Sequence, residues 1–126
     1  MLLKQPGNMT ENKKTVLKYM EGYSSHDHQK ILSCLMNEVT WEIPGIFYLS
    51  GKEAFDKKIE NEDVAGRPLV TVTRMMEENN IVVAEGSLQS RRKDGGLLNA
   101  VFCDVFHLEN GKIKQLVSYM MDKSVV

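Results

Sequence analysis

The sequence predicts an α+β domain, in which helices from the first half of the chain cover an antiparallel sheet made by the second half. Before Pro68 the apolar residues recur mainly at helical spacing, around a single strand-like segment, "VTWEIPG". After Pro68 there are four strand-like runs, "LVTVTRMM", "IVVAEGSLQSRR", "LLNAVFCDVFHL" and "KIKQLVSYMM", separated by the turn signals "ENN", "KDGG" and "ENG". The predicted order is therefore helix, helix, strand, helix and a four-strand meander.

One domain accounts for the whole chain. A length of 126 residues with 42% hydrophobic content is enough for one core and too short for two ordinary domains. We expect residues 10–124 to form this domain and residues 1–9 to be a flexible tail. We expect the natural start at Met1 or at Met9, which directly precedes the helical pattern.

Apolar spacing and a capping residue predict the helices. The first helix begins near Thr10, and its inward positions follow the i, i+3, i+4, i+7 pattern: Val16, Tyr19, Met20 and Tyr23. Asp27 is the expected N-cap of a short second helix. The inward residues of this second helix are Ile31, Leu32 and Leu35. A third helix lies within "GKEAFDKKIEN", with Phe55 and Ile59 turned toward the core.

The strand around residue 104 is apolar on both faces. One face carries Ala100, Phe102, Asp104 and Phe106, and the other carries Val101, Cys103, Val105 and His107. Three short helices can cover only one face of a sheet, so a second copy of the chain is expected to cover the other. This predicts a homodimer formed through the outer sheet face; the alternative is a monomer whose outer face is half polar.

Composition and charge argue against nucleic-acid and membrane partners. The formal net charge is -1, and the basic residues are scattered among carboxylates. The N-terminal segment has no hydrophobic run long enough for a signal peptide or a membrane span. Cys34, in a predicted helix, and Cys103, in a predicted strand, lack the spacing of a metal site or a disulfide framework. We therefore expect a cytoplasmic protein with reduced cysteines.

Asp104 is the residue that most strongly suggests chemistry. It lies inside the run "AVFCDVFHL", where an ionised carboxylate without a partner is very costly. Burial raises the pKa of a carboxyl group, so Asp104 could be a neutral acid that donates a proton or a hydrogen bond. The alternative is that donors from Tyr, Trp or the backbone satisfy it and that it only shapes the core.

The turn after the second strand of the meander decides whether Glu85 faces Asp104. If Asp94 and Gly95 form a two-residue turn, Glu85 lies opposite Asp104 on the same face, and the two carboxyls share a proton. With Gly95 and Gly96 as the turn, Ser87 takes that place and Glu85 becomes a diagonal neighbour. A three-residue loop sends Glu85 to the other face, and Glu85 can also simply be solvated at the end of the sheet.

The order of elements, the strand "VTWEIPG" and the segment "DVFHLENGKIKQL" resemble the SnoaL-like members of the nuclear transport factor 2 superfamily. The resemblance covers the chain from Thr10 onward. It implies a cone-shaped, barrel-like α+β fold of cystatin-like type, in which N-terminal helices pack on a curved antiparallel sheet and enclose one pocket. Its motifs are patterns of strand and turn, so they speak for the fold more than for an activity.

Ketosteroid isomerase belongs to the same superfamily, and the resemblance to it implies roles for three positions. Its oxyanion-binding tyrosine falls on Tyr19 and its neutral aspartic acid falls on Asp104. The carboxylate base that precedes the proline of the first strand falls on Ile43, which cannot accept a proton. We therefore do not expect a true ketosteroid isomerase.

Apolar residues on the predicted inner faces are candidates for the pocket lining, and each could equally be a core residue. With Glu85, the candidate ligand-binding residues are Trp41, Ile43, Phe55, Ile59, Phe102, Leu116 and Met120. His26, His28 and His107 do not have the spacing of a metal set, and we expect neither a metal nor a cofactor. The expected function is binding of a small apolar carbonyl or phenolic molecule, with acid or base catalysis of an isomerase, cyclase or hydratase type. The alternative is a non-catalytic ligand-binding or dimerisation module.

Overall fold

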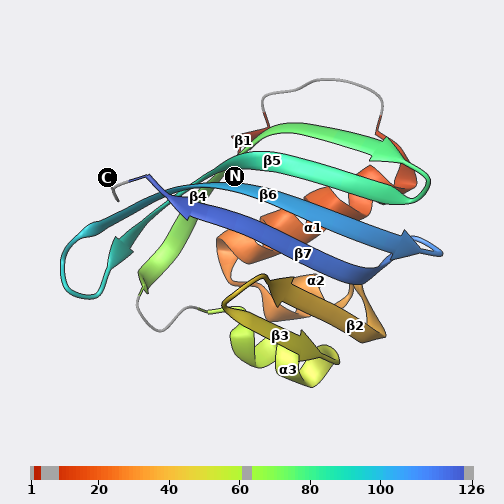
Figure 1. Cartoon of the computed structure of the whole chain (residues 1–126), viewed down its shortest axis with the longest axis horizontal. Coiled ribbons are helices and arrows are strands. Elements are labelled where there is room, and N and C mark those ends of the chain that lie inside the picture. Colours follow the sequence, from red (N-terminus) through yellow and green to blue (C-terminus); the bar gives the residue numbers. More distant parts are fainter. Residues whose placement is uncertain (1, 4–8, 61–63, 124–126) are drawn as a thin grey trace.

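Three helices lie on one side of a curved, open sheet in the computed structural model, which describes residues 2–3, 9–60 and 64–123 (Figure 1). The helices are α1 (Glu11–Ser25), α2 (His28–Leu32) and α3 (Lys52–Lys58). The strands are β1 (Leu2–Leu3), β2 (Leu35–Ile43), β3 (Phe47–Ser50), β4 (Val64–Glu78), β5 (Ile81–Arg92), β6 (Leu97–Glu109) and β7 (Lys112–Asp122). The predicted α+β class and the four-strand meander, β4 to β7, are confirmed. Within the described residues no helix is long and apolar enough to cross a membrane.

The strand order in the sheet is β1-β4-β5-β6-β7-β2-β3. The meander and the β2–β3 hairpin are antiparallel, whereas β2 pairs in parallel with β7 and β1 in parallel with β4. Figure 1 shows α1 crossing one face of the long strands, with β2, β3 and α3 together at one edge. The β2–β7 contact therefore joins the N-terminal half of the chain to its last strand.

Local hydrogen bonds fix the ends of the first two helices. The Thr10 side chain accepts from the backbone N–H of Lys13 at 3.1 Å, and Asp27 accepts from the N–H of Lys30 at 3.0 Å. The predicted N-cap Asp27 is thus confirmed. Between them, His26 takes the left-handed conformation (φ 54°) and ends α1.

The core lies between the helices and the inner face of the sheet. The two faces alternate along the strands, so that β5 and β6 bury every second residue. The fully buried side chains with the largest volumes are Phe55, Phe106, Ile31, Ile59, Leu108, Ile113 and Leu116. The predicted inward positions of α1, α2 and α3 are buried here, except that Tyr23 and Leu32 are only partly buried.

Several local predictions were wrong in detail. Cys34 lies in a turn and not in a helix, and Leu35 begins β2, because α2 ends at its C-cap Ser33. β4 begins at Val64, before Pro68; the register with β5 shifts between Ala65 and Leu69, and such a bulge accommodates a proline that has no N–H to donate. The sequence reasoning also missed β3, and β1 forms within the segment expected to be a tail.

Candidate functional site

Asp104 lies in the middle of β6 on the inner face of the sheet. Its neighbours across the strands are Ala84 of β5 and Ser118 of β7. Only 9% of its surface is exposed. Burial raises the pKa of the carboxyl from 3.8 to about 7, and a hydrogen bond with Ser118 offsets this effect in part. At neutral pH a large share of Asp104 is therefore the neutral acid, which can donate a hydrogen bond.

Two side-chain hydrogen bonds, both involving Ser118, connect Asp104 to Trp41 of β2. Trp41 Nε1 donates to Ser118 Oγ at 3.0 Å, and this leaves the Ser118 hydroxyl proton available for the Asp104 carboxyl. β2 presents Trp41 to Ser118 because the two strands pair in parallel, with Trp41 opposite Leu116 and Glu42 opposite Val117. The Trp41 indole thus donates to Ser118 and acts on Asp104 only through that hydroxyl. Sequence reasoning missed Ser118.

Two tyrosines of α1, Tyr19 and Tyr23, lie close enough to Asp104 for its charge to affect their pKa. Tyr19 is 2% exposed, and its ring centroid lies 5.4 Å from that of Phe106, 6.1 Å from that of Phe55 and 6.4 Å from that of Tyr23. Burial and then the charge of Asp104 raise the pKa of Tyr19 well above 10.0, and the same two causes raise the pKa of Tyr23 to about 12. Both phenols are therefore neutral donors near Asp104. Tyr23 was missed as a site residue, although its i+4 spacing from Tyr19 was visible.

The predicted lining residues divide into two groups. Phe55, Ile59 and Leu116 are at most 2% exposed and are core residues. Trp41 and Phe102 each keep 6% of their surface exposed, like Leu88, while Asp104 keeps 9%. The core is therefore closed around Phe55 and Leu116, and a small accessibility remains at Asp104, Trp41, Phe102 and Leu88.

A cavity of about 590 Å³ opens between the end of α1, the end of α3 and the inner face of β4 to β7. We call it the inner pocket. Its apolar lining includes Ile59, Leu88, Leu98 and Met120, and its polar lining includes Tyr23, His26, Glu60, Arg67, Ser90 and Lys93. Of the described residues, neither Asp104 nor Tyr19 lines it directly. Tyr23 links the two regions, since it lines the pocket and is close enough to Asp104 for that charge to raise its pKa.

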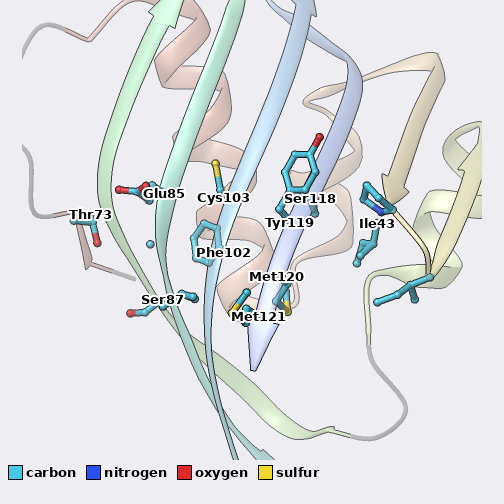
Figure 2. Close-up of a pocket in the computed structure, with 14 residues that line it drawn as sticks. Ile43, Thr73, Glu85, Ser87, Phe102, Cys103, Ser118, Tyr119, Met120 and Met121 are labelled. Atoms are coloured by element: carbon cyan, nitrogen blue, oxygen red, sulfur yellow. The ribbon is translucent and has the colours of Figure 1, made fainter. Parts of the chain in front are cut away.

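A second hollow of about 690 Å³ lies on the opposite face of the sheet. Figure 2 shows the side chains of this outer groove on neighbouring strands, among them Glu85, Cys103 and Tyr119. Five of its apolar residues are well exposed: Ile46 (74%), Met121 (69%), Tyr119 (53%), Met120 (43%) and Val101 (39%). Ile43, Phe102 and Met120, which were predicted to line a ligand pocket, border this groove, and Met120 borders both hollows.

The interpretation of Glu85 as the partner of Asp104 is wrong. The Arg92 N–H donates to the Gly96 carbonyl at 2.7 Å and closes a three-residue loop, Lys93 to Gly95, with Gly95 at φ 93°; the next pair along the ladder is Arg91 with Leu97. This register places Glu85 opposite Cys103 on the outer face, where it forms an ion pair with Arg74 at 3.0 Å. Of the alternatives left open by the sequence, the three-residue loop is the one that occurs.

His28 connects α2 to α3 outside the core. Its Nδ1 lies 2.6 Å from Asp56 and its Nε2 lies 2.6 Å from Glu60, and these two hydrogen bonds raise its pKa. His26 Nδ1 is 3.9 Å from Glu60. Over the described ranges no cluster of His, Cys, Asp and Glu side chains has the arrangement of a metal site.

Comparisons with known proteins agree with this architecture. A family model described as a SnoaL-like domain matches residues 16–116. No curated protein sequence matches the chain.

Solved structures with the same fold have little sequence identity to this chain. An epoxide hydrolase-like protein of M. tuberculosis is 16% identical with a TM-score of 0.78, over 90% of this chain and 84% of that one. A protein named TerC, crystallised with polyporic acid, is 18% identical with a TM-score of 0.79, over 92% and 94%. A putative SnoaL-like polyketide cyclase from Shewanella putrefaciens is 14% identical with a TM-score of 0.77, over 90% and 82%. These likenesses show the fold, and the family model covers most of the chain; the protein belongs to the SnoaL-like domain family.

Proposed function

We propose that the protein binds a small, mainly apolar molecule in the inner pocket and directs its carbonyl or phenolic oxygen toward Asp104 and the α1 tyrosines. The observation that carries this proposal is the Asp104 carboxyl, which is buried against Ser118 with a pKa raised to about 7. A carboxyl that is protonated near neutral pH can donate to an oxygen that ordinary aspartates repel. Tyr19 and Tyr23 supply neutral phenol donors beside it.

Donors grouped in a water-poor site favour an oxygen that gains negative charge. If the bound molecule reacts, Asp104 is the acid that polarises its carbonyl or protonates the oxygen. The resemblance to ketosteroid isomerase puts its base at Ile43, which cannot accept a proton and borders the outer groove rather than the inner pocket. The chemistry proposed is therefore acid-assisted isomerisation, cyclisation or hydration without a base at position 43. The names of the similar structures, which include an epoxide hydrolase-like protein and a polyketide cyclase, fit this class.

Binding of a planar phenol tests the proposal. The fluorescence of 2-naphthol would be titrated with wild type, Tyr23→Phe, which removes the phenol donor that lines the pocket, Asp104→Ala, which removes the carboxyl donor, and a matched control, Tyr119→Phe, which removes a hydroxyl on the outer face. Loss of one hydrogen bond to the phenol oxygen is expected to weaken binding about tenfold in the first two variants. The control should bind like wild type. Equal affinity in all four proteins, or no binding by wild type, would contradict the proposal.

A second candidate function is a dimerisation module without catalysis. It is favoured by the outer groove, where the exposed apolar side chains of Ile46, Tyr119 and Met121 gather on one face. In that case Asp104 shapes the core, and the phenol titration finds no specific site.

A further inference from the structure

Ser90 is a buried polar side chain that the proposed function does not use. It lies on the inner face of β5, opposite Leu98 of β6, and lines the inner pocket. Only 8% of the surface of Ser90 is exposed. Within the described residues its hydroxyl has no hydrogen-bond partner. An unpartnered buried hydroxyl costs stability, and buried polar groups in folded proteins are normally satisfied. A ligand in the pocket is the natural partner.

β4, the strand that pairs with β5 next to Ser90, places the side chain of Arg67 at the same end of the pocket. The pairing of β4 with β5 is interrupted between Ala65 and Leu69, opposite Gln89 to Arg91, so Arg67 lies in a bulge beside Ser90. Bulges redirect side chains and are common next to binding sites. Lys93, in the loop that follows β5, lines the pocket as well.

The charges at this rim favour an anion. Of the described carboxylates, none lies within ion-pair distance of Arg67 or Lys93. The one acidic side chain among the described lining residues, Glu60, is held by His28 at 2.6 Å. Among the described lining residues, two cations without an ion pair and one bound carboxylate therefore give an excess of positive charge.

From these observations we propose that the inner pocket takes an apolar carboxylate, whose carboxylate group accepts a hydrogen bond from Ser90 and is attracted by Arg67 and Lys93. This inference rests on the proposed function, because it assigns the charged end of the same ligand. The apolar body lies along Leu88 and Leu98, and the carbonyl or phenolic oxygen lies at the opposite end, toward Tyr23 and Asp104. The ligand class is thus an aromatic or aliphatic acid with a second oxygen function remote from its carboxylate.

Two fluorescent probes of similar shape test the carboxylate end of the pocket separately from the phenol end. 6-Hydroxy-2-naphthoate carries both a phenol and a carboxylate, whereas its methyl ester keeps the phenol and loses the charge. Wild type should bind the acid about tenfold more tightly than the ester, since hydrogen bonds to charged groups are the stronger ones. Added salt should reduce the preference, because it screens the exposed cations.

Variants of the lining residues test which side chains cause the preference for the acid over the ester. Ser90→Ala should bring the acid close to the affinity of the ester, and it should also raise the melting temperature of the free protein, because it removes an unsatisfied hydroxyl. A purely structural serine would lower that temperature. Arg67→Gln combined with Lys93→Gln should weaken binding of the acid and leave binding of the ester unchanged. The matched controls are Ser87→Ala, on the outer face of the same strand, and Arg74→Gln, on the outer side of β4; both should keep the wild-type preference.

Three other results would contradict the anion subsite, the proposed function or both. Equal binding of acid and ester by wild type would overturn the anion subsite while leaving the proposed function standing. Failure of both probes to bind would overturn the proposed function and this inference together. A preference that is lost in Ser87→Ala but kept in Ser90→Ala would place the probe in the outer groove and overturn the assignment.

Discussion

Enclosing the Asp104 carboxyl between Ala84 and Ser118 makes the stability of this protein depend on pH. The pKa rises from 3.8 to about 7 on folding, so over that interval the folded state holds a proton that the unfolded chain releases. The free energy of unfolding should therefore fall as the pH rises from about 4 to about 7, and this contribution should level off above that range. Asp104→Asn removes the titration, and it should gain a few kcal/mol relative to wild type between pH 5 and pH 8.

Urea unfolding of both proteins at pH 5 and pH 8 measures this difference. Ser118→Ala is a useful comparison, because it removes the hydrogen bond that partly opposes the shift and should raise the pKa of Asp104 further. If Asp104→Asn loses the same amount of stability at both pH values, the carboxylate is a specifically bonded anion and the neutral-acid account fails.

Gly86, on the inner face of β5, is a second residue whose surroundings restrict the choice of side chain, because there is no space for a Cβ atom. A Cβ at this position would lie 2.0 Å from the backbone oxygen of Thr71 and 3.0 Å from Cζ of Phe102. Because a backbone oxygen cannot move aside without breaking the β4–β5 ladder, Gly86→Ala should destabilise the fold by about 3 kcal/mol. Gly96→Ala, whose nearest neighbours are the flexible side chains of Asp94 and Arg92, is the control. Similar unfolding midpoints for the two variants would show that β4 yields at this point.

Among the secondary-structure elements, α2 is joined to α3 and the residues after it through one histidine, His28. His28 can donate to Asp56 and Glu60 at once only as the imidazolium, and the two bonds raise its pKa above 6.5. A raised pKa means that the stabilisation is complete below pH 6.5 and is lost as the pH rises through the folded-state value. His28→Gln should therefore cost more stability at pH 6 than at pH 9. Because both carboxylates are 43% to 58% exposed, water limits the effect to about 1 kcal/mol.

Thermal unfolding of wild type and His28→Gln at the two pH values measures the difference. His107→Gln is the matched control, since His107 is exposed on β6 and has no such pair among the described residues. An equal cost of His28→Gln at pH 6 and pH 9 would mean that the imidazole acts through packing and not through its charge.

The sequence predicted whether a segment is a helix or a strand where its apolar pattern was long. It did not predict which residues pair across neighbouring strands. The periodic apolar positions of α1 and the alternation of β6 were enough to place Tyr19 and Asp104 on the inner side. The partner of Asp104 depended on the loop at Lys93 to Gly95, and one residue more or less in that loop reverses the face of Glu85. Ser118 and Ser90 were missed because a serine in a strand has no pattern of its own; only its neighbours across the sheet give it a role.

At the scale of the whole molecule, the outer groove is the surface that we expect a second copy to cover. Tyr119 and Met121 project from β7, exposed by 53% and 69%, and the Arg74–Glu85 ion pair lies on the same face beyond β6. A two-fold interface places the same patch on both partners, so the apolar side chains meet one another and each copy brings both charges. Tyr119→Glu should convert a dimer into a monomer, as measured by light scattering after size-exclusion chromatography at micromolar concentration.

Tyr48→Glu tests whether any loss of association is specific to the groove. Tyr48 is 64% exposed on β3 and is not a groove residue, so this variant should remain dimeric. A monomeric wild type would contradict the prediction, and so would dissociation of both variants.

The parallel pairing of β2 with β7 also sets the time at which a newly made chain can fold. Ser118, which receives the hydrogen bond of Trp41, comes 77 residues later in the sequence. While the ribosome is still making the last strand, β2 and β3 have no place in the sheet, and the apolar faces of α1 and β2 are open to solvent and to chaperones. Asp104 is likewise covered only when β7 arrives beside it. The chain thus completes its core and its candidate site in one late step, once β7 has been made, and a nascent chain cut short before β7 would have neither.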